Sequence, residues 1–221
     1  MRPGGTTPIP YHPPMATIHQ ATLTPTKLEL LASWLPGRRW YPDDVTKDLE
    51  RIAACRFDDP AGEVGVETFV VRAGDGPLVH VPMTYRAAPL AGSDYFLIGR
   101  LEHSVLGERW VYDAVGDPVY IAALAAAIRT GGQEAEEFVE TPDGPQRREP
   151  LMTVRGSGSA TAAPDPGPPV RVEDGDPVVV ATPGVRVEVR RILTGESADG
   201  PLNLTGTWPS APRRYVLAVL G

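Results

Sequence analysis

Few residues in this sequence have the type and spacing that catalysis or metal binding requires. The only cysteine, Cys55, lies in the apolar run RIAACRF, where a buried free thiol is expected. None of the four scattered histidines lies at ligand spacing from it: His12, His19, His80 and His103. Ser104 follows His103, but adjacent side chains on a strand point to opposite faces, so they cannot act as nucleophile and base. We therefore expect no metal site and no catalytic nucleophile.

Phosphate-binding and carboxylate chemistry are also poorly supported. The sequence contains no GxxxxGK[ST] or GxGxxG loop, and no kinase-type HxDxxxxN loop with a second, metal-binding aspartate. Asp113 and Asp117 flank a Gly-Asp-Pro corner, and two carboxylates are what a glycosidase needs. Turn formation by Asp113 and helix capping by Asp117 explain both residues more simply. We expect no catalytic residue and no cofactor.

A cluster of aromatic and arginine side chains is better suited to binding. The segment SWLPGRRWYP brings together Trp34, Arg38, Arg39, Trp40 and Tyr41. Rings and guanidinium groups of this kind anchor protein interfaces. The rings are also compatible with a sugar platform or with core packing, and the arginines with a phosphate, a carboxylate or a solvated turn. We predict these five residues as an interaction surface.

Composition limits the class of partner. The chain has 221 residues and a net charge of −7, which disfavours contact with nucleic acid or an anionic membrane. Its longest uncharged apolar run, VYIAALAAAI, is far shorter than the roughly 20 residues that span a bilayer. The N-terminus has no apolar signal core. We expect a cytoplasmic protein.

The predicted elements form an α+β fold. A helix should follow Thr24 as N-cap and Pro25 as first helical residue, and end at Pro36. Alternating apolar runs predict strands within 49–57, 64–74, 77–90, 94–103 and 108–114. Short connections favour an antiparallel meander, and period two favours one buried face. A second helix should run from Asp117 to Gly131 and present Tyr120, Leu124, Ala127 and Ile128 to the sheet.

Low-complexity segments divide the chain. Residues 1–14 should be a disordered extension, which leaves Met1 or Met15 as the start. Residues 15–155 then form the α+β domain, 156–169 a flexible linker and 170–221 a small β-rich appendage. The segments EEFVETPDG and PLMTVRGSG could supply one further strand pair.

Three longer motifs lie within residues 23–128: WLPGRRWYP, VPMTYR and IGRLEHSVLGERWVYDAVGDPVYIAALAAAI. In this combination they resemble the N-terminal cap domain of actinobacterial maltokinases. The resemblance implies a curved antiparallel sheet packed on one or two helices. In that family the cap precedes a kinase domain that phosphorylates maltose with ATP and magnesium, and feeds trehalose-to-glucan metabolism. This sequence ends before such a domain, so no catalytic or ATP-binding position is transferred.

The C-terminal segment RRILTGESADGPLNLTGTWPSAPRRYVLAVL resembles the first hairpin of a kinase small lobe. The following strand, VLAVLG, lacks the lysine that would contact phosphates. We therefore expect a non-catalytic, cap-like interaction module that works with a sugar kinase or another enzyme of trehalose, maltose and α-glucan (glycogen) metabolism. Two alternatives stay open: a small sugar-binding protein or enzyme that uses the concave sheet face, and the cap half of a split, ATP-dependent maltokinase-like sugar kinase.

Overall fold

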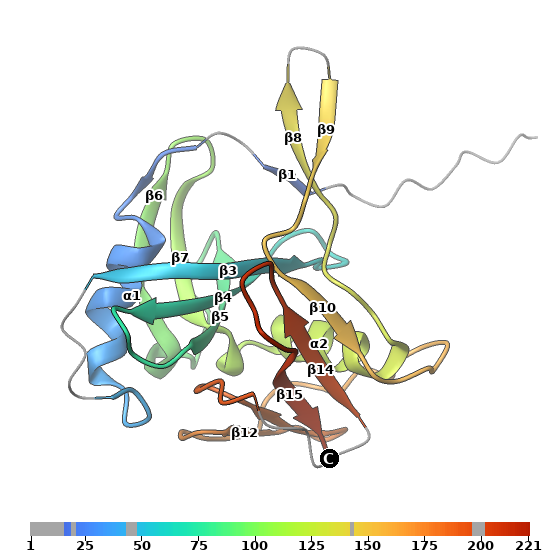
Figure 1. Cartoon of the computed structure of the whole chain (residues 1–221). Helices are drawn as coiled ribbons and strands as arrows, with labels where there is room; N and C mark the ends of the chain where they lie inside the picture. The colour runs from blue at the N-terminus through green and yellow to red at the C-terminus, as the bar shows by residue number, and fades with distance from the viewer. Residues whose placement is uncertain (1–15, 19–20, 43–47, 142–143, 196–201) are drawn as a thin grey trace, which may run out of the picture.

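The computed structural model describes residues 16–18, 21–42, 48–141, 144–195 and 202–221. The predicted disordered extension, 1–14, lies outside these ranges. Within them the chain is α+β, with two α-helices and three sheets (Figure 1). The helices are α1 (Lys27–Trp34) and α2 (Pro118–Thr130), and single 3₁₀ turns are η1 (Leu35–Gly37), η2 (Asp94–Phe96) and η3 (Ala114–Gly116).

The N-terminal sheet is antiparallel and has the strand order β2-β6-β7-β5-β4-β3. Its strands are β2 (Leu23–Thr24), β3 (Leu49–Phe57), β4 (Gly65–Ala73), β5 (Val79–Arg86), β6 (Leu97–His103) and β7 (Gly107–Asp113). The five predicted strands β3 to β7 are confirmed. The predicted meander is wrong at one place, because β5 pairs with β7 and not with β6. Within the β6–β7 hairpin, the second strand, β7, pairs with β5, and the first strand, β6, lies on the other side of β7.

The prediction of one buried sheet face is also wrong, because both faces are covered. On β4, Val66 and Val70 belong to a core that includes α2, whereas Phe69 and Val71 belong to a core that includes α1. Leu31 of α1 is fully buried in the second core. Apolar residues at successive positions of β4 follow from this two-sided burial.

The two helices begin at side-chain caps. Thr26, and not the predicted Thr24, caps α1: its hydroxyl accepts from the backbone N–H of Glu29 at 3.2 Å, and the Glu29 carboxylate accepts from the backbone N–H of Thr26 at 2.7 Å. The prediction for α2 is confirmed. Asp117 caps it, Pro118 is its first residue, and Gly131 ends it with a φ of 68°. The predicted stripe is buried: Tyr120, Leu124, Ala127 and Ile128.

The C-terminal sheet is antiparallel with the order β10-β14-β15-β13-β12-β11. Its strands are β10 (Thr153–Gly156), β11 (Arg171–Glu173), β12 (Val178–Ala181), β13 (Arg186–Val189), β14 (Asn203–Thr207) and β15 (Tyr215–Leu220). The segment PLMTVRGSG thus pairs with β14, and not with EEFVETPDG as predicted. Helix α2 packs against β10, β14 and β15, and one core joins the helix to both large sheets. The predicted domain boundaries stay a prediction.

The chain after β10 runs very close to the end of α2. The backbone N–H of Gly158 donates to the Ile128 carbonyl at 2.8 Å, and that of Ala160 to the Arg129 carbonyl at 2.9 Å. A Cβ atom on Gly156 would lie 1.9 Å from the carbonyl oxygen of Ala127, so only glycine fits there. The start of the predicted flexible linker is therefore held by backbone hydrogen bonds.

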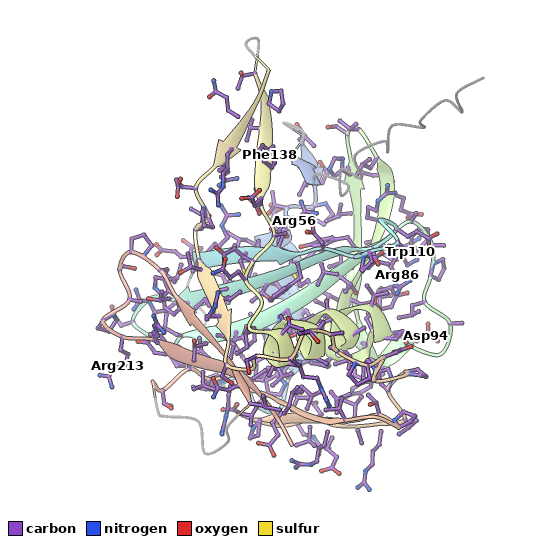
Figure 2. All side chains as sticks on the ribbon, turned by 90° about the vertical axis from the view of Figure 1, so that its right-hand side faces the viewer. Arg56, Arg86, Asp94, Trp110, Phe138 and Arg213 are labelled. Atoms are coloured by element: carbon purple, nitrogen blue, oxygen red, sulfur yellow. The ribbon has the colours of Figure 1, made fainter. Side chains whose placement is uncertain are left out.

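A third, small sheet has the order β1-β8-β9 and consists of β1 (Ala16–Ile18), β8 (Glu137–Thr141) and β9 (Gly144–Arg148). β1 pairs in parallel with β8, and β8 and β9 form a hairpin that projects from the body of the molecule (Figure 1). Figure 2 shows Phe138 on this hairpin and Arg213 in the connection between β14 and β15.

Candidate functional site

The predicted aromatic and arginine residues lie where α1 ends and the chain turns through η1. The rings of Trp34 and Trp40 meet edge to face with centroids 6.0 Å apart, and those of Trp40 and Tyr41 at 6.4 Å. The guanidinium group of Arg38 lies 4.9 Å from the Trp34 ring and 5.9 Å from the ring of Tyr95. These contacts form a cluster of rings in which the Arg38 cation lies near both Trp34 and Tyr95.

Residues from the C-terminal part of the chain also contact these rings. Trp40 Nε1–H donates to Asp174 Oδ1 at 3.0 Å, and the hydroxyl of Tyr95 donates to Asp174 Oδ2 at 3.0 Å. The guanidinium group of Arg191 lies 4.7 Å from the Trp40 ring. We call the contacts of Trp40, Asp174 and Arg191 the junction, because they connect the N-terminal and C-terminal sheets.

A buried ion pair lies at the centre of the junction. The Nη2 group of Arg191 donates to Asp113 Oδ2 at 2.6 Å, and the exposed fractions of the two side chains are 0 % and 7 %. Burial raises the pKa of Asp113, and the Arg191 charge acts in the opposite direction. In the described part of the chain, Nε and Nη1 of Arg191 have no hydrogen-bond acceptor, and the guanidinium group lies against the Trp40 ring. Removal of either ion would leave an unpaired buried charge.

The backbone completes the connection beside this pair. The N–H of Arg191 donates to Asp176 Oδ1 at 2.8 Å, and its carbonyl accepts from the N–H of His80 at 2.8 Å. His80 Nδ1 lies 2.8 Å from the carbonyl oxygen of Arg190, so Nδ1 carries the proton. Burial lowers the pKa of His80 to about 3, opposed by the Arg190 hydrogen bond and assisted by Arg191. The imidazole is therefore a neutral structural group.

The five predicted site residues are only partly at the surface. Trp34, Trp40 and Tyr41 have exposed fractions of 7 %, 8 % and 8 %, so their rings are core residues. Arg38 is half-buried and Arg39 is exposed. Tyr95, beside Arg38, is 63 % exposed and was not in the predicted set. We call Arg39 and Tyr95, together with the visible part of Arg38, the Arg39–Tyr95 edge.

The other candidate residues have structural roles. Asp117 is fully buried; besides its cap, it accepts from Thr84 Oγ1 and from Arg86 Nε and Nη2, each at 2.7 Å. Figure 2 shows Arg86 near Trp110, its partner across β5 and β7. Burial raises the pKa of the Cys55 thiol well above its ordinary value, so it stays protonated and unreactive. Across the described ranges, no three His, Cys, Asp or Glu residues are grouped to hold a metal ion.

No motif or spacing indicates the partners that meet at the junction. Asp174, His80 and Arg191 are single polar residues in or beside strand-like segments, and Asp113 and Arg191 are 78 positions apart. The nearest hint was His80, a polar residue inside the run PLVHVPMTY. No helix of the described residues has the length and apolar character needed to span a membrane.

Fold and junction together define an α+β module in which a curled antiparallel sheet is held between a capped helix and a second sheet. Residues 34–117 match the sequence model of the maltokinase N-terminal cap domain. The match begins at Trp34 in the cluster of rings, covers β3 to β7 and ends at Asp117, the N-cap residue of α2. This part of the chain is similar to that cap domain. A search among curated proteins gave no match.

Proposed function

We propose that this chain is a non-catalytic, cap-like interaction module that binds a sugar kinase, or another enzyme of trehalose, maltose and α-glucan metabolism, in the cytoplasm. The observation that carries the proposal is the match of residues 34–117 to a domain that belongs to a kinase. A kinase is therefore the first partner to test.

The chemistry of the side chains supports a binding role over a catalytic one. Phosphoryl transfer needs fixed cations and metal-binding carboxylates around the transferred group. Asp113 is paired with the buried Arg191. Asp117 is bound by the half-buried Arg86 and by the backbone N–H of Val119 at the start of α2. The sequence also contains no phosphate-binding loop.

The Arg39–Tyr95 edge is the surface that fits a protein partner best. Tyrosine and arginine are the residue types that most often carry binding energy in interfaces. Tyr95 is anchored by Asp174 and packs edge to face on Phe96 at 5.3 Å, so its exposed ring is already ordered before binding. Arg39 adds a positive charge to a chain whose net charge is −7, which favours an acidic patch on the partner.

No observation favours the two alternatives. A sugar site on the concave sheet face would need polar groups that converge there, but the two cores that pack on the faces of the N-terminal sheet are apolar. A split kinase would need catalytic groups from a second chain. Both remain predictions.

The test is a titration of this chain with a purified maltokinase from the same organism, followed by isothermal calorimetry. We expect saturable binding with a dissociation constant on the order of 1 μM, as for a transient interface. Tyr95→Ala and Arg39→Glu should each weaken binding at least about tenfold.

Matched controls come from the opposite end of β6. Val105→Ala removes an exposed apolar group, and Arg100→Glu reverses an exposed charge. Both should leave binding unchanged. The absence of heat and of a complex at about 100 μM of both proteins, or equal binding by all variants, would argue against the proposal. So would turnover of ATP with maltose by this chain alone.

A further inference from the structure

A groove lies between the start of α1 and the first half of β3, away from the junction. Its volume is about 630 Å³, within the range of small-molecule sites. Six of its lining residues divide into an apolar part and two cations: Leu23, Leu28, Leu49 and Phe69, with Lys27 and Arg51. This combination of apolar wall and fixed charge is the usual composition of a ligand site.

A β-bulge aims Arg51 into this groove. The pairing of β3 with β4 shifts at Ile52: Arg51 lies opposite Val71, whereas Ala53 lies opposite Val70. Without the extra residue, Arg51 would share the face of Ala53, which packs on the α2 side. Because of the bulge, Arg51 lies on the α1 side of the sheet. Bulges often redirect a side chain in this way next to binding or active sites.

The two cations are held in different ways. Lys27 forms an ion pair with Glu67, and its ammonium lies 4.8 Å from the Tyr85 ring and 5.6 Å from the Phe69 ring. Tyr85 also donates to Glu67 at 2.9 Å. Burial would raise the pKa of Glu67, but Lys27 and these hydrogen bonds bring it below the ordinary value, so the carboxylate is charged and neutralises Lys27.

Arg51 is the cation that remains available. Its guanidinium group lies 5.3 Å from the Phe69 ring, and among the residues described it makes no ion pair. Arginine stacks on rings through its flat face and keeps its N–H groups in the plane, where they match the two oxygens of an oxyanion. Phe69 therefore orients Arg51 without using its donors.

We propose that this groove binds a small amphipathic carboxylate, with the carboxylate on Arg51 and a short apolar chain on Leu23, Leu28 and Leu49. The charge of Lys27 is neutralised by Glu67, so Arg51 alone supplies the positive charge for the carboxylate. Glu50, also on the lining, disfavours ligands with more than one negative charge. This inference is independent of the binding of a sugar kinase.

The test is an amide NMR titration of the full chain with hexanoate. We expect saturable shifts of amides around Leu28 and Arg51, with a dissociation constant of about 1 mM or below. Three related compounds should each bind at least about fivefold more weakly than hexanoate. Acetate has only the carboxylate, 1-hexanol has only the apolar chain, and hexyl phosphate carries more negative charge.

Variants separate the anion contact from the apolar groove. Arg51→Gln should weaken hexanoate about fivefold to tenfold, and Arg51→Lys should recover part of the affinity. Arg100→Gln, on the β6–β7 hairpin, is the matched control and should bind as the wild type does. Equal binding of hexanol and hexanoate, or unchanged affinity in Arg51→Gln with an intact spectrum, would overturn the proposal, as would absence of saturable shifts. Tighter binding of hexyl phosphate would overturn the assignment to a carboxylate.

Discussion

Acidification should destabilise this protein through one buried imidazole, His80. Its pKa in the folded state is about 3, whereas an unfolded histidine titrates near 6.5. Between these values the unfolded chain binds one more proton than the folded chain, so the free energy of unfolding falls as pH decreases. The stabilisation is fully present above pH 6.5 and is lost progressively toward pH 3.

The size of the effect follows from the shift. One pH unit in this window corresponds to about 1.4 kcal/mol, so the loss between pH 7 and pH 5 is about 2 kcal/mol, and over the whole window about 5 kcal/mol. The upper part of the window is the better range for measurement, because most carboxyl groups titrate below pH 5. A loss of this size is a large fraction of the stability of a typical domain.

The assay is urea unfolding followed by tryptophan fluorescence at pH 7 and pH 5, for the wild type and His80→Asn. Asparagine does not titrate, and its amide can donate to the Arg190 carbonyl as Nδ1 does. The wild type should lose about 2 kcal/mol more than the variant. Parallel losses in the two proteins, or an NMR titration of His80 near pH 6.5, would refute the reasoning.

Three further predictions concern contacts that hold the sheets and helices together. Arg191→Met should lower the free energy of unfolding in urea by about 3–5 kcal/mol, because Asp113 stays buried without its partner. The second substitution Asp113→Leu should recover most of that loss, and a double variant as unstable as the single one would contradict this. Gly156→Ala should lower stability by about 1–3 kcal/mol, because its Cβ would collide with the Ala127 carbonyl. Gly62→Ala tests backbone strain alone, because Gly62 has a φ of 71° and open space around it. Equal losses in the two variants would remove the steric explanation. Thr26→Ala should cost about 1 kcal/mol of thermal stability through loss of the capping box, and an unchanged melting temperature would contradict the assignment of the cap.

Local patterns predicted the elements of the fold well, because each depends on neighbouring residues. Alternation alone located β3 at residues 49–57, and the Asp-Pro and Gly signals located both ends of α2. The cap of α1 was missed although its signature was present: Thr26-Lys-Leu-Glu29 is a capping box, whereas Thr24 precedes a proline. The signal for this cap is therefore present in the sequence.

Long-range features could not be predicted, because period two identifies faces and not neighbours. Nothing in the sequence indicates that β7 would enter beside β5, or that β10 would leave the N-terminal half to pair with β14. The same limit applies to the candidate site. The residue type of Trp40 suggested binding, but its ring is covered by contacts with Asp174 and Arg191, which lie far along the chain.

Hydrogen exchange of this chain, with and without the purified maltokinase, tests the central claim most directly. If the chain is a binding module that uses the Arg39–Tyr95 edge, the kinase should slow exchange in residues 38–41 and 94–97 and leave the β6–β7 turn at 104–107 unchanged. Identical exchange with and without the kinase, or protection confined to other parts of the chain, would contradict the account.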